Sequence, residues 1–200
     1  MHNDEKLLEL FEQLPDRYWD FKTENPKEFT HGLHAYPGTM ISHISRNLIR
    51  MLQDITPIHS LLDPFSGSGT VLVESMLAGI EKIDGNDINP LAVVISKVKT
   101  TPLDMDVLER ESDILRSHIE TAYQKNRVID KADDYIEGTC GLDITRKSGW
   151  GDNAPAYLAS FCKENGVPVK FPEFKSLGYW FRPYVVLSLS VILEEIRKTE

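Results

Sequence analysis

Residues 63–70, with the sequence DPFSGSGT, have the side chains and backbone freedom to hold a small charged ligand. Gly67 and Gly69 lack Cβ atoms, so the backbone there can pass close beneath a ligand and adopt positive φ. A helix that starts after them would offer free amide groups and the positive end of its dipole to an anion, most plausibly a carboxylate. Asp87 follows Asp63 by 24 residues, near the offset of about 20 residues at which an acidic side chain reaches ribose hydroxyls. The pattern predicts a site for a small ligand that carries a ribose.

Two other nucleotide sites are disfavoured by what this loop lacks. A Walker-type phosphate loop needs a lysine directly after its last glycine, and Thr70 follows Gly69 here. A dinucleotide fingerprint needs a third glycine, and Leu72 stands at that position. The loop on its own is weak evidence, and the two flanking aspartates strengthen it.

The elements around this loop predict an alternation of strands and helices. We expect a strand over 58–62, a helix over 70–78, a strand over 82–86 and a helix over 90–98. Gly79 suits the left-handed position that ends a helix, and Asn89 followed by Pro90 is typical of a helix start. This is a βαβα unit, and a right-handed crossover makes its two strands parallel.

The remaining chain predicts helices with irregular connections. We expect helices over about 7–14, 42–53, 104–126 and 156–164 and from residue 183 onward, an exposed connector over 16–32, and an extended segment over 171–174. Residues 131–151 predict an irregular insertion or a strand near Tyr135, and the cluster Tyr179, Trp180 and Phe181 is expected to pack the terminal helix on the sheet. The predicted parts are an N-terminal helix and connector (1–32), a ligand-binding core (33–103), and a helical and irregular extension (104–200).

The composition is that of a folded domain with an acidic surface. The 200 residues are 41% hydrophobic and carry 22 Lys and Arg against 31 Asp and Glu, a net charge of −9. Without a basic face, contact with nucleic acid would have to be local or supplied from outside this chain. No apolar run suggests a membrane span or signal peptide, so a cytoplasmic location is expected. Cys140 and Cys162 are expected to be reduced, and the histidines and cysteines show no metal spacing.

Three stretches of the sequence resemble one family in its motif order. Residues 63–70 resemble the first S-adenosylmethionine (SAM) motif of the amino-methyltransferases that modify N6 of adenine or N4 of cytosine in DNA, enzymes associated with restriction-modification. Residues 85–92 (GNDINPLA) are similar to the second motif, and residues 34–38 (HAYPG) to the motif that lies just upstream of the first. Together the three motifs cover residues 31–98.

The resemblance implies an α/β fold of the Rossmann-like SAM-dependent methyltransferase type, with an incomplete parallel sheet, helical additions, and SAM as cofactor. It implies that Asp63 and the backbone of Gly67 and Gly69 hold the methionine amino and carboxylate groups, and that Asp87 accepts the ribose hydroxyls. Ile88 would pack on the adenine ring. The full set of implied cofactor-binding residues is Tyr36, Pro37, Asp63, Phe65, Gly67, Ser68, Gly69, Thr70, Asp87 and Ile88.

The family's catalytic motif, (D/N/S)PP(Y/F/W), is absent from the sequence. The nearest approximations, residues 153–157 (NAPAY) and 182–184 (RPY), lack the Pro-Pro pair or the acceptor. We therefore assign no catalytic residue and expect the SAM-binding portion of a truncated or split DNA methyltransferase, inactive alone. Its expected partners are DNA, contacted through a missing or separate region, and a complementary subunit that carries the motif.

Two alternatives stay open at the level of sequence. RNA guanine-N2 methyltransferases share the form of residues 63–70, although they usually carry a sizeable RNA-binding domain ahead of the fold. A non-catalytic SAM-binding or partner-binding subunit would use the helix over 104–126 and the terminal helix to dock a partner. Neither the target base nor the oligomeric state follows from the sequence.

Overall fold

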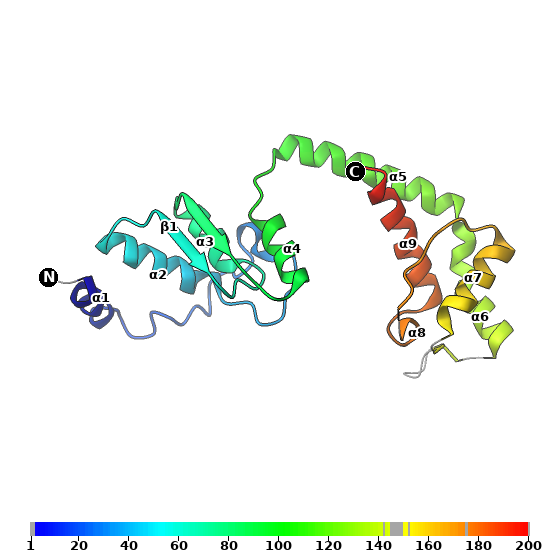
Figure 1. Ribbon diagram of the computed structural model, residues 1–200, viewed down its shortest axis with the longest axis horizontal. Helices are drawn as coiled ribbons and strands as arrows, with labels where there is room; N and C mark the ends of the chain where they lie inside the picture. The colour runs from blue at the N-terminus through cyan, green and yellow to red at the C-terminus, as the bar shows by residue number, and fades with distance from the viewer. Residues whose placement is uncertain (1–2, 142, 145–149, 152, 175, 200) are drawn as a thin grey trace. The chain divides into compact units, whose positions relative to one another are not determined.

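A computed structural model describes residues 3–141, 143–144, 150–151, 153–174 and 176–199 (Figure 1). The chain divides into two compact units, Met1–Pro102 and Leu103–Glu200, which are described separately. None of the helices in the described ranges is both long enough and apolar enough to span a bilayer.

The first unit contains the predicted parallel βαβα arrangement. Its elements are α1 (Asn3–Glu12), the 3₁₀ helix η1 (Phe29–Gly32), α2 (Ser42–Ile55), β1 (Ser60–Asp63), α3 (Thr70–Leu77), β2 (Lys82–Gly85) and α4 (Pro90–Lys99). Strands β1 and β2 pair in parallel, from Ser60 opposite Lys82 to Asp63 opposite Gly85. The carboxyl ends of both strands therefore lie at the same edge, where the loops that lead into α3 and α4 begin.

Glycine, asparagine and proline set the boundaries of α3 and α4 as the sequence predicts. Gly69 is the left-handed N-cap of α3, with φ of 78°, and Gly79 follows the helix with φ of 76°. Asn89 caps α4 by accepting a hydrogen bond from the Leu91 amide through its side chain, and Pro90 is the first residue of that helix. These local signals fix where each loop of the candidate site begins and ends.

The core of the first unit lies where α2, α3 and α4 pack around the strands. Its buried apolar residues are Ile49, Met51, Leu72, Val73, Ile80, Ala92 and Ile95. Gly85 permits close packing at the end of β2, because a Cβ there would lie 2.5 Å from Leu72 Cδ1. The sheet is covered only in part, since Leu62 of β1 is 66% exposed.

The described residues of the second unit form helices joined by non-helical segments, and they include no strand. It comprises α5 (Met105–Lys125), η2 (Arg127–Lys131), α6 (Ala132–Cys140), α7 (Ala154–Asn165), α8 (Leu177–Trp180) and α9 (Pro183–Arg197). Helices α5 and α9 contact each other, and α6, α7 and η2 pack beside α9 or one another. The largest fully buried side chains of its core are Trp150, Phe161, Ile129, Ile136, Leu158, Leu177 and Leu187.

Two expectations for this unit are wrong. The described part of 131–151 contains the helix α6 instead of an irregular insertion or a strand near Tyr135, because Ile129, Ala132 and Ile136 recur at helical spacing and are fully buried. Residues 142 and 145–149 of that stretch lie outside the described residues. The aromatic cluster does not pack inward as a whole, since Trp180 is 69% exposed.

Candidate functional site

The loop between β1 and α3 has the backbone conformation that its glycines predict. Gly67 has φ of 49° and Gly69 has φ of 78°, values in the left-handed region that favour glycine. A Cβ on Gly69 would lie 3.0 Å from Ser96 Cα, so this glycine also permits α4 to approach the loop. The Ser96 hydroxyl lies 2.7 Å from the Gly67 carbonyl oxygen and joins α4 to the same loop.

Asp87 binds the glycine loop directly. One carboxylate oxygen accepts a hydrogen bond from the Gly67 amide at 2.8 Å, and the other accepts one from the Asn89 amide at 2.8 Å. The Ser66 amide also donates to the Asn86 carbonyl oxygen at 2.9 Å. The loop after β2 is thus fastened to the loop after β1, with a carboxylate at their junction.

Asp63 and Phe65 lie on the other side of this loop. The Asp63 carboxylate accepts a hydrogen bond from the Phe65 amide at 3.0 Å, and its carbonyl oxygen accepts one from the Asn86 amide at 2.9 Å. Phe65 itself is 87% exposed. An aromatic ring so little covered is available to a ligand seated on the loop.

Tyr36 reaches this loop from a segment far away in the sequence. Its hydroxyl accepts a hydrogen bond from the Asn89 side-chain amide at 3.1 Å, and its Cε1 would lie 3.9 Å from a Cβ placed on Gly67. The Asn89 side chain therefore caps α4 with its oxygen and binds Tyr36 with its nitrogen. The cap is visible in the sequence, whereas nothing there indicates the bond to Tyr36, 53 residues away.

Six of the predicted site residues line one small cavity, and the others lie around it. The lining includes Tyr36, Asp63, Phe65, Gly67, Ser68 and Thr70. Asp87 reaches this group through Gly67, and Gly69 holds the start of α3. Pro37 is exposed and does not line the cavity, and Ile88 is 99% exposed beside Asp87.

A buried ionic cluster on α3 is not predicted by any sequence pattern. Glu74 of α3 lies 2.8 Å from His31 Nε2 and accepts hydrogen bonds from Arg46 Nε and Nη2 at 2.8 and 3.0 Å. Burial alone would raise the pKa of Glu74, but hydrogen bonds from His31 and Arg46 outweigh it and lower the pKa to about 2. The hydrogen bond to Glu74 in turn raises the pKa of Arg46 against the opposing effect of burial, with further help from Glu28.

The approximations to the catalytic motif lie at helix starts. Asn153 is the N-cap residue of α7, and Pro183 is the first residue of α9. The Tyr184 amide donates a hydrogen bond to the Asp133 carboxylate at 3.0 Å. Neither stretch follows a strand in the described part of the chain.

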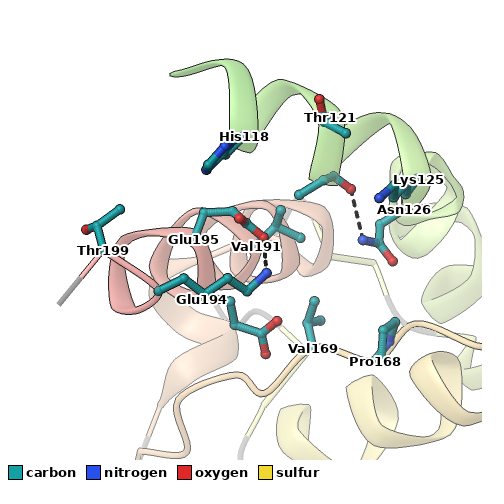
Figure 2. A pocket seen from close by; sticks show the side chains of 12 residues that line it. His118, Thr121, Lys125, Asn126, Pro168, Val169, Val191, Glu194, Glu195 and Thr199 are labelled. Atoms are coloured by element: carbon teal, nitrogen blue, oxygen red, sulfur yellow. Dashed lines mark hydrogen bonds and ion pairs between the residues drawn. The ribbon is translucent and has the colours of Figure 1, made fainter. Parts of the chain in front are cut away.

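The second unit has a pocket of its own, between α5, α9 and residues 168–169 (Figure 2). Its polar lining includes His118, Lys125 and Glu194. Glu194 accepts a hydrogen bond from the Lys170 amide, and Lys198 is paired with Glu195. None of the predicted site residues lines this pocket. Over the ranges that the structure describes, no group of three His, Cys, Asp or Glu side chains is placed to hold a metal ion.

Comparisons with known proteins identify relatives of the chain. The Type II methyltransferase M.MvaI of Kocuria varians is 32% identical over 178 residues, which cover 88% of this chain and 31% of that protein. The Type II methyltransferase M.MjaII of Methanocaldococcus jannaschii is 36% identical over 112 residues, which cover 53% of this chain and 21% of that protein. The chain thus spans about a third of the first relative and a fifth of the second. No solved structure matches it.

The sequence model of the RMKL-like methyltransferase domain matches residues 33–147, more than half of the chain. The match includes all three stretches that resemble SAM motifs, and with them the loop after β1, the loop after β2 and the segment that carries Tyr36. The sequence-based prediction of a methyltransferase is thereby supported at the level of the family. The chain belongs to the RMKL-like methyltransferase domain family.

Proposed function

We propose that this chain is the SAM-binding portion of a Rossmann-like DNA amino-methyltransferase. The observation that carries the proposal is the junction at the carboxyl edge of the parallel strands, where the Asp87 carboxylate binds the amide of the glycine loop. Ligands of open α/β sheets bind at this edge. Membership of a methyltransferase family and two relatives named as Type II methyltransferases support the same assignment.

The residues around this junction fit SAM in charge and polarity. The start of α3 suits the methionine carboxylate, and Asp63 suits the ammonium group. The implied contacts from the Gly67 and Gly69 amides do not fit, because these amides already donate to the Asp87 carboxylate and to the Ser66 carbonyl oxygen. The Asp87 oxygens each have a second lone pair for a ribose hydroxyl. SAM, when bound, supplies the methyl group that is transferred. Tyr36 and Pro37 would cover the methionine side.

Two exposed apolar side chains, Ile88 and Phe65, are placed to receive the adenine ring. Both stand beside the loops that carry the candidate polar contacts, and both are almost uncovered. Apolar surface of this kind gains free energy when a flat ring removes it from water. Ser68 and Thr70 are buried within the loop and would shape its backbone beneath the ligand.

We further propose that the catalytic motif and the DNA-contacting surface come from a complementary segment or subunit. In the described part of the chain, β1 pairs with β2 alone, and Leu62 of β1 remains exposed. A complementary strand that covered Leu62 would extend the sheet and bury this apolar surface. The net charge of −9 also favours a basic surface outside this chain.

Isothermal titration calorimetry with SAM tests the cofactor proposal on the full 200-residue chain. We expect saturable binding of one SAM per chain. A titration that shows no heat of binding would overturn the proposal. Incubation with DNA and radiolabelled SAM tests the second part, because we expect no transfer by the chain alone. Methylation of DNA without any added protein would overturn the split arrangement.

A second candidate function is a non-catalytic subunit that docks a partner through α5. This helix buries none of its residues in the described structure, and it exposes Val107, Leu108 and Ile114. The same titration separates the two functions, since a docking subunit that does not use SAM gives no heat. An RNA guanine-N2 methyltransferase would bind SAM as well and would be distinguished by transfer to RNA once the complementary protein is added.

A further inference from the structure

Glu74 is a buried carboxylate on the second turn of α3, and the proposed cofactor contacts do not use it. It is 1% exposed and accepts hydrogen bonds only from His31 and Arg46 among the described residues. Its low pKa keeps it ionised, so it acts as an acceptor and His31 Nε2 must carry the proton of their bond. His31 Nδ1 is then left buried without a partner, so the bond to Glu74 is the polar contact that fixes this ring.

The two partners of Glu74 flank residues 34–38 in the sequence, one before this segment and one after it. His31 is in η1, just before residues 34–38, and Arg46 is in α2, just after them. Both flanks of this segment are therefore bound to α3, the helix that follows the glycine loop. A second bond ties the upstream end, because the Thr30 hydroxyl donates to the Lys99 carbonyl oxygen at the end of α4 at 3.1 Å.

Residues 34–38 carry Tyr36, the side chain that covers the glycine loop. The ring lies beside Gly67, and its hydroxyl accepts a hydrogen bond from Asn89. The rest of the segment is exposed, and the Thr39 hydroxyl, one residue beyond it, donates to the Tyr36 carbonyl oxygen. Beyond the bond from Asn89, its position over the loop thus depends on bonds at its two flanks.

We propose that Glu74 is a positioning residue for the cofactor, which holds both flanks of residues 34–38 so that Tyr36 stays over the loop at Gly67. The proposal rests on the proposed SAM site. It assigns to Glu74 an effect on SAM affinity that passes through Tyr36, although Glu74 is not among the residues that line the small cavity at the loop. The negative charge and both oxygens are needed, because three donors from two different elements converge on them.

A double-mutant cycle on SAM affinity tests this coupling in the full chain. Glu74→Gln keeps the shape of the side chain but loses its charge and one acceptor. We expect it to weaken SAM binding about tenfold, the effect of one lost charge-assisted hydrogen bond. In a Tyr36→Ala background the same change should cost less than about twofold, because the side chain through which Glu74 acts is gone. If the losses of SAM affinity from Glu74→Gln and Tyr36→Ala multiply in the double variant, the two residues act independently and the proposal is overturned.

Hydrogen–deuterium exchange gives a second readout that needs no cofactor. We expect exchange over residues 29–41 to rise more in Glu74→Gln than exchange over α4, which reports the general loss of stability of the first unit. Glu81→Gln, at an exposed position before β2, is the matched control and should change neither readout. His31→Gln releases only the upstream flank and replaces Glu74→Gln if that variant does not fold. Unchanged exchange over residues 29–41 would overturn the proposal even if SAM binds, whereas failure of the wild-type chain to bind SAM would overturn the proposed function alone.

Discussion

The Asp87 carboxylate accepts a hydrogen bond from the Gly67 amide at 2.8 Å, across 20 residues of sequence that include all of α3 and β2. The bond joins the loops that follow β1 and β2, where the methionine and ribose groups of SAM would be held in the proposed site. Asp87 therefore has two tasks in the proposed site, since it shapes the glycine loop and presents its remaining lone pairs to ribose hydroxyls.

Replacement of Asp87 is expected to abolish most SAM affinity. Asp87→Ala removes two charge-assisted bonds to ribose and also releases the Gly67 amide, so we expect the dissociation constant to rise by more than about tenfold. Calorimetric titration with SAM measures the change. Asp84→Ala is the matched control, because Asp84 lies on β2 and is exposed, with only a long ion pair to Lys82. Unchanged affinity in Asp87→Ala would remove this residue from the site.

Ile88 should matter for binding and not for folding. Its side chain is almost completely exposed, so Ile88→Ser should change the free energy of unfolding by less than about 0.5 kcal/mol. If adenine packs on it, SAM affinity should fall about fivefold, the effect of roughly 1 kcal/mol of apolar contact. Urea denaturation and calorimetry measure the two effects separately. Val98→Ser on α4, also exposed, should change neither, and an equal loss of affinity in both variants would contradict the assignment.

Two glycines with nearly the same backbone angle should differ in their tolerance of a methyl group. Gly79→Ala meets no atom within 4 Å, so it should cost only the left-handed conformation, about 1 kcal/mol. Gly69→Ala adds contacts near 3.0 Å with Ser96 on α4 and should cost about 2–3 kcal/mol or more. Urea denaturation of the two variants measures the difference. Equal costs would show that α4 can move away from the loop.

The elements of the first unit could be predicted because local residue types fix their ends. Positive φ occurs at Gly69 and Gly79, and a helix starts at Pro90. These are properties of the backbone at the residues themselves, so the residue types indicate them. The periodicity that marks α6 was also present, in Ile129, Ala132 and Ile136, but the charges and Gly138 around it obscured the pattern.

The links between segments of the site could not be predicted in the same way. Glu74 meets His31 across 43 residues and Arg46 across 28, and Tyr36 meets Asn89 across 53. Helical and strand periods describe which face of an element is apolar, and they carry no information on which polar side chains meet after the chain folds. The motifs identified the loops, and the structure adds how they are held together.

The stability of the first unit should fall in acid through Glu74. His31 and Arg46 face this carboxylate, with Glu28 behind Arg46, and they lower its pKa from 4.5 to about 2. Because the pKa is lower in the folded state, ionised Glu74 stabilises the fold above pH 4.5, by up to about 3 kcal/mol, and this contribution is lost as the pH falls toward 2. The difference in unfolding free energy between wild type and Glu74→Gln, measured by urea denaturation from pH 7 to pH 2.5, should therefore shrink below pH 4.5. Glu81→Gln should show no such trend, and a pH-independent difference for Glu74→Gln would mean that its charge does not stabilise the fold.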